Sequence, residues 1–332
     1  MRRLFMKAAM VSSLAALATG TTACAQEHKA YTDPTQAGPD YAIQGEYLGE
    51  VRGDEGPKKV GVQVIALGDG KFMATAYVGG LPGEGWERGQ ERFQVEGKTK
   101  DGVTVFKGEH AEGRLADGVL TVYDTGGQKL GELKRVERAS PTLGAKPPEG
   151  AVVLFDGSSL EAFEGGTLTP DGLLLSRPTA RSKQSFGSFQ LHLEFRTPFM
   201  PTATGQARGN SGVYLQNCYE IQVLDSFGLE GKNNECGGIY SVQEPRLNMC
   251  LPPLVWQTYD VEFTAPKFDN QGKKIANARV SVKHNGVSIY EDLELPRLTP
   301  GGASAEAPTG PLMLQDHGNP VMYRNIWIVE RK

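Results

Sequence analysis

Apolar and polar residues alternate in short runs along most of the chain after residue 40. In KVGVQVIAL (59–67) and FQLHLEFR (189–196) every second side chain is apolar, and successive side chains of a strand point to opposite faces. Turn residues, mostly glycine with asparagine or aspartate, separate these runs, and no long segment of helical period intervenes. The pattern predicts an all-β chain of antiparallel strands.

A proline- and glycine-rich segment, ASPTLGAKPPEG (139–150), divides the strands into two groups and is typical of a linker. Residues 41–138 carry short strands at a spacing of roughly 8–12 residues, which predicts a small antiparallel barrel or sandwich. His110 is the only histidine of this unit and its acidic residues are scattered, so we expect an accessory or docking domain. Residues 151–332 predict a two-sheet antiparallel sandwich. Residues 26–40, which are polar and broken by proline, predict another linker.

Two strands of the second unit carry polar side chains at alternate positions. The apolar residues of YEIQVLD (219–225) face one side and its polar residues the other, and LMLQDH (312–317) repeats the pattern. The alternative is an ordinary solvated face of an antiparallel sheet. If the two strands share a sheet, one polar concavity is lined by Glu220, Gln222, Gln315 and His317.

The N-terminus has the three parts of a secretory signal peptide: a basic start, an apolar run over 8–18, and the small-residue site Ala23-Cys24-Ala25. We expect cleavage after Ala25 and a periplasmic or secreted protein. Lipid anchoring through Cys24 is the minority alternative, because Thr21 stands where a bulky aliphatic residue is usual. No other stretch approaches the roughly 18 apolar residues of a transmembrane helix.

The net charge of the chain disfavours some classes of binding partner. Removing residues 1–25 deletes three basic residues and no acidic one, which changes the formal net charge from −4 to −7. An acidic chain without a run of basic residues binds nucleic acid or an anionic membrane poorly.

Three cysteines remain after cleavage. Export permits a disulfide, and the loop-like run between Cys236 and Cys250 makes these two the expected pair, with Cys218 as a buried thiol. No C-x-x-C spacing occurs, so metal binding by cysteine is not expected.

Four separated segments in the second unit resemble one known family: RGNSGVYLQNCYEIQVLDSFG, NECGGIYSVQEPRLNMCLPPLVWQTYDVEFTAPKFD, ARVSVKHNGVSIYEDLELP and GPLMLQDHGNPVMYRNIWIVE. They resemble the 3-keto-disaccharide hydrolase domain family over about residues 150–330. The resemblance implies a concanavalin-like jelly-roll sandwich that acts on oxidised glycosides outside the cytoplasm. It leaves open whether a separate sugar 3-dehydrogenase supplies the ketone, and it does not cover residues 41–138.

A conventional glycosidase needs two carboxyl groups roughly 5–5.5 Å or 6.5–9.5 Å apart. Glu220 and Asp225 are about 17 Å apart along a strand and on opposite faces. The E-x-D-x-E pattern of laminarinase-like enzymes becomes Glu220-x-Gln222-x-Leu224 here. The second acid is missing, which disfavours that mechanism.

The glycosidic bond of a 3-keto sugar can be cleaved by another route, because the ketone acidifies the hydrogen on C2. One base removes that proton, the enolate expels the group on C1, and water adds afterwards. His317 is the first candidate for the base, and Glu220 is the second, as base or as acid for the leaving group. Arg324 can polarise the ketone, although a surface salt bridge is the alternative.

The remaining candidates would bind substrate or metal. His192 and Glu194 share one face of a strand and, with a second histidine, can bind a divalent cation that stabilises an enolate, although the spacing is no recognised ligand pattern. We expect His284 to be exposed in a hairpin turn. Acidic residues 225, 230 and 235 are either ligands of a structural calcium or solvated loop residues. The candidate substrate-binding residues are Gln222, Gln315, Arg208, Asn210, Tyr214, Gln216, Tyr240 and Trp256, the last two being equally consistent with core packing.

The main rival function is a non-catalytic carbohydrate-binding module, in which the same concavity only holds a glycan. A binding module needs amides and aromatic rings and has little use for an ionisable base.

Overall fold

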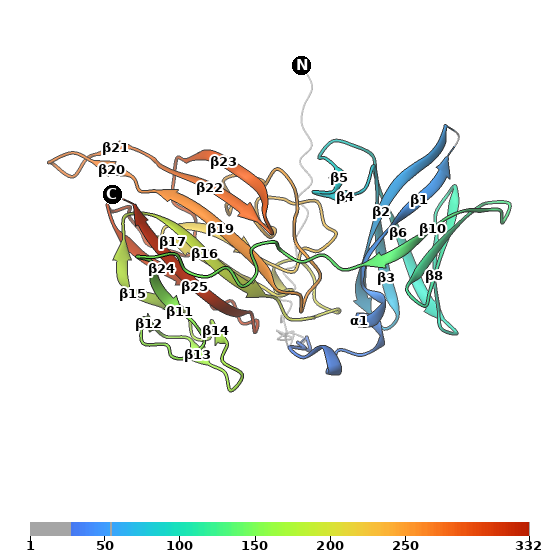
Figure 1. Cartoon of the computed structure of the whole chain (residues 1–332), viewed down its shortest axis with the longest axis horizontal. Coiled ribbons are helices and arrows are strands. Elements are labelled where there is room, and N and C mark those ends of the chain that lie inside the picture. The colour runs from blue at the N-terminus through green and yellow to red at the C-terminus, as the bar shows by residue number, and fades with distance from the viewer. Residues whose placement is uncertain (1–27, 54, 332) are drawn as a thin grey trace, which may run out of the picture.

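The computed structural model describes residues 28–53 and 55–331, which form two β units side by side (Figure 1). The expected signal peptide and its cleavage site lie outside the described residues. No helix among the described residues is long and apolar enough to cross a membrane.

The first unit is a closed antiparallel barrel with the strand order β1-β10-β9-β8-β7-β6-β3-β2. Its interior holds large apolar side chains, including Tyr47, Phe72 and Phe106. Short elements precede it or lie within it: η1 (Pro34–Gln36), α1 (Pro39–Ile43), β4 (Leu81–Pro82) and β5 (Gly85–Trp86). The barrel strands are β1 (Gly45–Gly53), β2 (Gly56–Gly68), β3 (Lys71–Val78), β6 (Arg92–Lys100), β7 (Val103–Lys107), β8 (Ala111–Ala116), β9 (Val119–Asp124) and β10 (Lys129–Val136).

The second unit is a sandwich of two antiparallel sheets, so the predicted fold class is confirmed. The larger sheet has the order β13-β14-β25-β16-β19-β22-β23, with β11 also paired to β25, and the smaller sheet has the order β12-β15-β24-β17-β18. A two-stranded arm, β20 (Lys267–Phe268) and β21 (Lys274–Ala276), projects from the sandwich (Figure 1). The larger sheet comprises β11 (Val152–Phe155), β13 (Thr167–Leu168), β14 (Leu174–Leu175), β16 (Ser188–Arg196), β19 (Gln257–Thr264), β22 (Ala278–His284), β23 (Val287–Leu295) and β25 (Met322–Arg331). The smaller sheet comprises β12 (Phe163–Glu164), β15 (Ala180–Phe186), β17 (Ser211–Leu215), β18 (Tyr219–Val223) and β24 (Gly310–Leu314).

The core lies between the two sheets and follows the alternation of the sequence. Ile221, Val223 and Leu314 of the smaller sheet belong to the same buried cluster as Leu193 and Phe195 of the larger sheet. Burying each such side chain contributes about 1.5–3 kcal/mol. Because these apolar residues face inward, the alternate residues of β17, β18 and β24 form the outer face of the smaller sheet.

The β22–β23 hairpin has the expected turn, with Asn285 and Gly286 both at positive φ (50° and 79°). The expectation that His284 is exposed is wrong. Its ring is fully buried and packs edge-on against the ring of Tyr259, and its Nε2 lies 3.0 Å from Oε1 of Gln257. Burial lowers the pKa of His284 to about 3, so this histidine is a neutral core residue.

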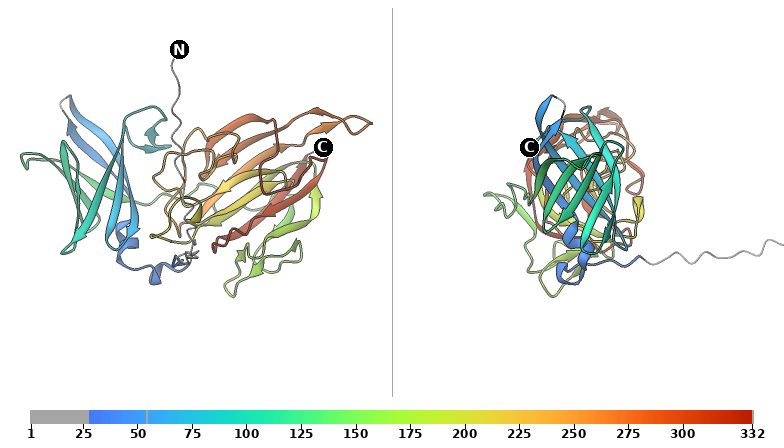
Figure 2. Two further views of the ribbon diagram at one scale, coloured as in Figure 1. Left: turned by 180° about the vertical axis from the view of Figure 1, so that it is seen from behind. Right: turned by 90° about the vertical axis from the view of Figure 1, so that its right-hand side faces the viewer.

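The barrel is fixed against one end of the sandwich (Figure 2). Ile65, Tyr77 and Trp86 of the barrel belong to the hydrophobic cluster of the sandwich. Arg88 of the barrel also donates hydrogen bonds to carbonyl groups of the sandwich, among them that of Gly231 at 2.9 Å. Through these contacts the loops of the sandwich next to the barrel pack against residues of the first unit.

Candidate functional site

A polar row crosses the outer face of the smaller sheet. In the register of β17 with β18, Tyr214 faces Glu220 and Gly212 faces Gln222. The Tyr214 hydroxyl lies 2.9 Å from Oε2 of Glu220 and accepts a hydrogen bond from Nε2 of Gln315 at 3.2 Å. The structure thus brings Glu220, Gln222 and Gln315 to one face.

Glu220 is the buried carboxyl group of this row, with 3% of its surface exposed. Burial raises its pKa to about 7, although the hydrogen bond from Tyr214 works in the opposite direction. The loop after β23 covers it: Thr299 Oγ1 accepts from the Glu220 N–H at 2.8 Å, and the Pro300 carbonyl accepts from Tyr214 at 2.8 Å. Gly212 is required beside it, because a Cβ there would lie 2.2 Å from Oε1 of Glu220. A carboxyl group with this pKa can both take up and release a proton near neutral pH.

Three buried amide oxygens near this row have no hydrogen-bond partner within the described part of the chain: Oε1 of Gln222, Oε1 of Gln315 and Oδ1 of Asn210. Buried polar atoms are nearly always paired, and leaving one unpaired costs about 1–3 kcal/mol. Their amide nitrogens are engaged, since Gln206 accepts from both Gln222 and Asn210 at 3.1 Å. These oxygens are therefore hydrogen-bond acceptors without a protein donor.

Tyr240 lies on the loop beside β18 and is half-buried. Its N–H donates to the Glu220 carbonyl at 3.2 Å. Burial, then the charge of Glu220, and to a smaller extent Tyr240, raise the pKa of Tyr214 well above its ordinary range. Tyr240 therefore lies close to the polar row.

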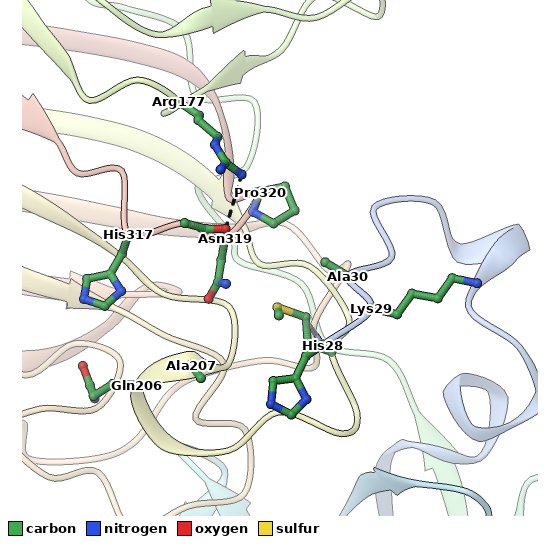
Figure 3. A pocket seen from close by; sticks show the side chains of 11 residues that line it. His28, Lys29, Ala30, Arg177, Gln206, Ala207, His317, Asn319 and Pro320 are labelled. Atoms are coloured by element: carbon green, nitrogen blue, oxygen red, sulfur yellow. Dashed lines mark hydrogen bonds between the residues drawn. The ribbon is translucent and has the colours of Figure 1, made fainter. Parts of the chain in front are cut away.

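A cavity of about 890 Å³ lies next to this row (Figure 3). It is lined by His317 and Asn319 from the loop between β24 and β25, by Gln206 of η2 (Gly205–Ala207), and by His28 and Arg177. Gln206 joins the two regions, because its side chain lines the cavity and contacts Gln222. His317 is exposed and forms no hydrogen bond with Glu220. It lies at the mouth of the site, whereas the strand alternation predicted a position on the polar row.

Arg324 does not reach this site, contrary to the sequence prediction. It lies on β25 of the larger sheet, where its Nε is 2.6 Å from Oε2 of Glu194 and its guanidinium lies 4.0 Å from the ring centre of Trp256. Trp256 also lies beneath Arg196. Side-chain alternation correctly predicted that Arg324 points away from the core. Its strand, however, belongs to the larger sheet, whereas Glu220 lies on the smaller sheet. Arg324 and Trp256 therefore cannot contact the same ligand as Glu220.

Two further candidates are structural. Arg208 is buried, pairs with Asp225 at 2.7 Å and donates to the carbonyl of Ala66 in the barrel. Gln216 lies in the turn between β17 and β18 with φ 52°, and its amide nitrogen donates to carbonyl groups of two neighbouring loops. These contacts tie together loops that support the site.

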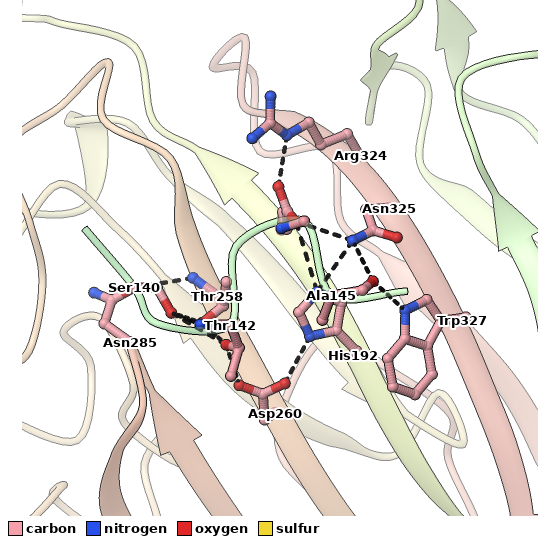
Figure 4. Close-up of polar contacts among 12 residues, drawn as sticks. Ser140, Thr142, Ala145, His192, Thr258, Asp260, Asn285, Arg324, Asn325 and Trp327 are labelled. Atoms are coloured by element: carbon pink, nitrogen blue, oxygen red, sulfur yellow. Dashed lines mark hydrogen bonds and ion pairs between the residues drawn. The ribbon is translucent and has the colours of Figure 1, made fainter. Parts of the chain in front are cut away.

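The metal candidates lie under the interdomain linker on the outer face of the larger sheet (Figure 4). Nδ1 of His192 is 2.6 Å from Oδ1 of Asp260. Glu194 accepts from the N–H of Gly144 in the linker and from Nε of Arg324, both at 2.6 Å. The carboxylate oxygens and both ring nitrogens are engaged with protein groups, and within residues 28–53 and 55–331 no three or more His, Cys, Asp or Glu side chains are arranged so that they could hold a metal ion.

This network stabilises the charged forms of both Glu194 and His192. Burial acts to raise the pKa of Glu194, but the hydrogen bonds from His192, Asn325, Gly144 and Arg324 outweigh it and lower the pKa to about 2. Burial acts to lower the pKa of His192, and its hydrogen bonds to carboxylates outweigh burial and raise it. The expected metal ligands therefore bind the linker to the sandwich.

The candidate calcium ligands also have protein partners. Asp225 pairs with Arg208, and Oε2 of Glu235 accepts from the backbone N–H groups of Gly231 and Lys232. Glu230 is exposed. The interpretation as ordinary loop residues fits these contacts.

The expected disulfide is absent, and Cys218, Cys236 and Cys250 are buried free thiols. Cys236 and Cys250 contact one another, and the Cys236 sulfur also lies 3.3 Å from the Tyr259 hydroxyl. Both sulfurs belong to the core cluster and have hydrogen-bond partners there, so the loop between them is held by packing.

Sequence analysis missed Gln206, Asn319 and His28. Gln206 and Asn319 lie in loops without periodicity, and His28 lies in a segment expected to be a linker. The Gly-Asn-Pro turn after His317 was the one available signal for Asn319.

The chain is similar to one protein family and to solved structures. The sequence profile of the 3-keto-alpha-glucoside-1,2-lyase-like domain family matches residues 150–329. A crystal structure from Parabacteroides distasonis, provisionally assigned as a glycosyl hydrolase, is 34% identical and covers 55% of this chain and 85% of its own, with a TM-score of 0.51. A second structure from that organism with the same assignment is 18% identical, covers 55% of this chain and 95% of its own, and has a TM-score of 0.42. No curated protein matches the chain.

Proposed function

Because the chain belongs to the 3-keto-alpha-glucoside-1,2-lyase-like domain family, whose match suggests a carbohydrate-active enzyme, we propose that its sandwich cleaves 3-keto-glycosides through the proton on C2. The observation that carries this proposal is Glu220, a buried carboxyl group with a pKa of about 7 beside unpaired amide oxygens. Its pKa matches the task of a general base at neutral pH.

In the proposed reaction the Glu220 carboxylate removes the hydrogen on C2, and the electrons of that C–H bond form an enolate with the C3 ketone. The enolate collapses, the C1–C2 double bond forms, and the C1–O bond breaks. The departing oxygen takes a proton, and the product is a 1-ene-3-ketose, that is, a 3-keto-glycal that keeps its C2 hydroxyl. Addition of water across the double bond then gives the free 3-keto sugar, so elimination followed by hydration equals hydrolysis.

Other residues of the site have supporting parts in this proposal. Tyr214 donates a hydrogen bond to the Glu220 carboxylate and so keeps a fraction of it ionised at neutral pH. The unpaired oxygens of Gln222 and Gln315 accept hydrogen bonds from sugar hydroxyls. His317 lies on the cavity side and has no hydrogen-bond partner in the described part of the chain, which suits it to protonate the departing oxygen.

Two other functions are weaker. A two-carboxylate glycosidase needs a second free acid near Glu220, and Asp225 is paired with Arg208. A carbohydrate-binding module would use the amide oxygens equally well, but nothing in binding requires a buried carboxyl group with a raised pKa. We also propose that the protein acts outside the cytoplasm and that a sugar 3-dehydrogenase supplies its substrate, since the ketone must be formed by oxidation.

The test compares an aryl 3-keto-glucoside with its unoxidised parent. We expect release of the phenol from the keto compound alone. Release from both compounds at similar rates would indicate a conventional glycosidase. Binding of both without release would indicate the binding module.

A further inference from the structure

The cavity beside the polar row is lined by basic and amide side chains together with the apolar residues Ala30, Met200, Ala207 and Pro320. His28, Lys29, Arg177 and His317 contribute to its wall, and no aspartate or glutamate among the described residues does. This is unusual in a chain whose formal net charge is −4. A concave wall that carries a fixed positive charge and no carboxylate concentrates anionic ligands.

The histidine from the N-terminal segment is held in place. Three residues after it, Tyr31 pairs with Phe199 of the sandwich through backbone hydrogen bonds of 3.0 and 2.9 Å. The ring of His28 lies 3.1 Å from the Thr202 hydroxyl through Nδ1, which leaves Nε2 for a ligand. Residues outside both β units are therefore fastened to the sandwich at this point and complete the cavity wall.

The other polar groups of the wall differ in orientation. Arg177 forms no ion pair with any described residue, and its guanidinium makes one long contact of 3.5 Å with the Gly318 carbonyl. Lys29 points away from the cavity, with its ammonium group 4.5 Å from the ring centre of Tyr31 (Figure 3). Asn319 accepts a backbone hydrogen bond through Oδ1, so its NH₂ group remains as a donor.

From this lining we propose that the cavity is a subsite for an oxyanion carried by a sugar, either the carboxylate of a uronic acid or a sulfate or phosphate ester. An arginine fork and imidazole N–H groups without competing carboxylates match the acceptor oxygens of such a group. The volume of about 890 Å³ is large enough for a sugar residue. Because Gln206 joins the cavity to Gln222, the subsite holds the part of the substrate that lies beyond the sugar bound at Glu220. This last assignment rests on the proposed function.

The test measures binding of free sugars by ligand-observed NMR to the chain without its first 25 residues: D-glucuronate, D-glucose 6-sulfate, D-glucose 6-phosphate and neutral D-glucose. We expect at least one charged sugar to bind about tenfold more tightly than glucose, with a preference that weakens at high salt. A preference for glucuronate over both esters identifies a uronic acid, and the reverse identifies an ester. Equal affinities for charged and neutral sugars, or no binding of any of them, would overturn the proposal.

Variants localise the effect. Arg177→Gln and His28→Gln should each reduce the preference for the charged sugar at least threefold, and Lys29→Gln, which removes a charge that points away, should not. An equal loss in Lys29→Gln would mean diffuse surface charge and would contradict a subsite. Thermal unfolding of each variant verifies folding, and His28→Gln changes a side chain outside both β units. The sugars are not oxidised, so this result is independent of whether the chain cleaves 3-keto-glycosides.

Discussion

The Tyr214 hydroxyl lies between Oε2 of Glu220, at 2.9 Å, and the Pro300 carbonyl, at 2.8 Å. A phenol has one hydrogen to donate. When Glu220 is ionised, Tyr214 can donate to it, and when Glu220 is protonated the carboxyl group can donate to Tyr214, which then donates to Pro300. The same geometry therefore accommodates both protonation states of a carboxyl group whose pKa lies at about 7.

Tyr214→Phe should shift the pH dependence of kcat/KM upward. The base must be ionised, so the rate rises with pH through the pKa of Glu220. The hydrogen bond from Tyr214 lowers that pKa, and a hydrogen bond to a charged group contributes about 1.5–3 kcal/mol, so its loss raises the midpoint by about one unit or more. Tyr123→Phe in the barrel is the control. An unchanged midpoint in Tyr214→Phe would show that Tyr214 does not set the pKa of the catalytic base, and would contradict this prediction.

Glu220→Gln should stabilise the protein at alkaline pH. The pKa of Glu220 is higher in the folded state than its ordinary value of 4.5, so the folded state binds this proton more tightly and the wild type loses stability as the pH rises from 4.5 through 7. At 1.36 kcal/mol per pKa unit, the loss at pH 8 relative to Glu220→Gln is about 3 kcal/mol. Urea unfolding of both proteins at pH 5 and pH 8 measures it. A difference in stability independent of pH would contradict the raised pKa.

Glu194→Ala should destabilise the sandwich by about 1–3 kcal/mol, since it removes a buried carboxylate that pairs with the partly exposed Arg324 and leaves the linker N–H of Gly144 unpaired. The effect should diminish as the pH falls from 4.5 towards 2, where the wild-type carboxylate becomes protonated. Glu262→Gln, in an exposed pair with Arg331 on the same sheet, should cost less than about 1 kcal/mol. If the wild type contained a metal ion and became less stable when that ion was removed, the result would instead support the metal site predicted from sequence.

The thiols give a direct chemical test of the cysteine arrangement. In the chain without its first 25 residues, Cys218, Cys236 and Cys250 are buried and should react with a thiol reagent only after unfolding. We expect three reactive thiols in denaturant without reductant. One reactive thiol would show that a disulfide forms after all.

The sequence alone predicted which side chains of a strand face the core and which face outward, because these positions follow from side-chain alternation. The core positions of β17 and β18 and the outward positions of Glu220 and Gln222 follow from the period of a strand. Alternation cannot tell which sheet a strand joins, and for this reason Arg324 was placed with Glu220 although β25 lies in the opposite sheet. His192 and Glu194 have the right parity for a metal site, but a linker distant in sequence covers them. His28 and Gln206 depend on long-range packing of loops, for which the sequence has no periodic signal.

The most direct test of the proposed mechanism is exchange of the C2 hydrogen. A methyl 3-keto-glucoside is incubated in heavy water with wild type, Glu220→Gln and the exposed control Glu230→Gln, and the C2 signal is followed by proton NMR. The account predicts that wild type and Glu230→Gln exchange or eliminate this hydrogen, and that Glu220→Gln does so about 10²–10⁴-fold more slowly. Exchange at the wild-type rate in Glu220→Gln would contradict the assignment of Glu220 as the base.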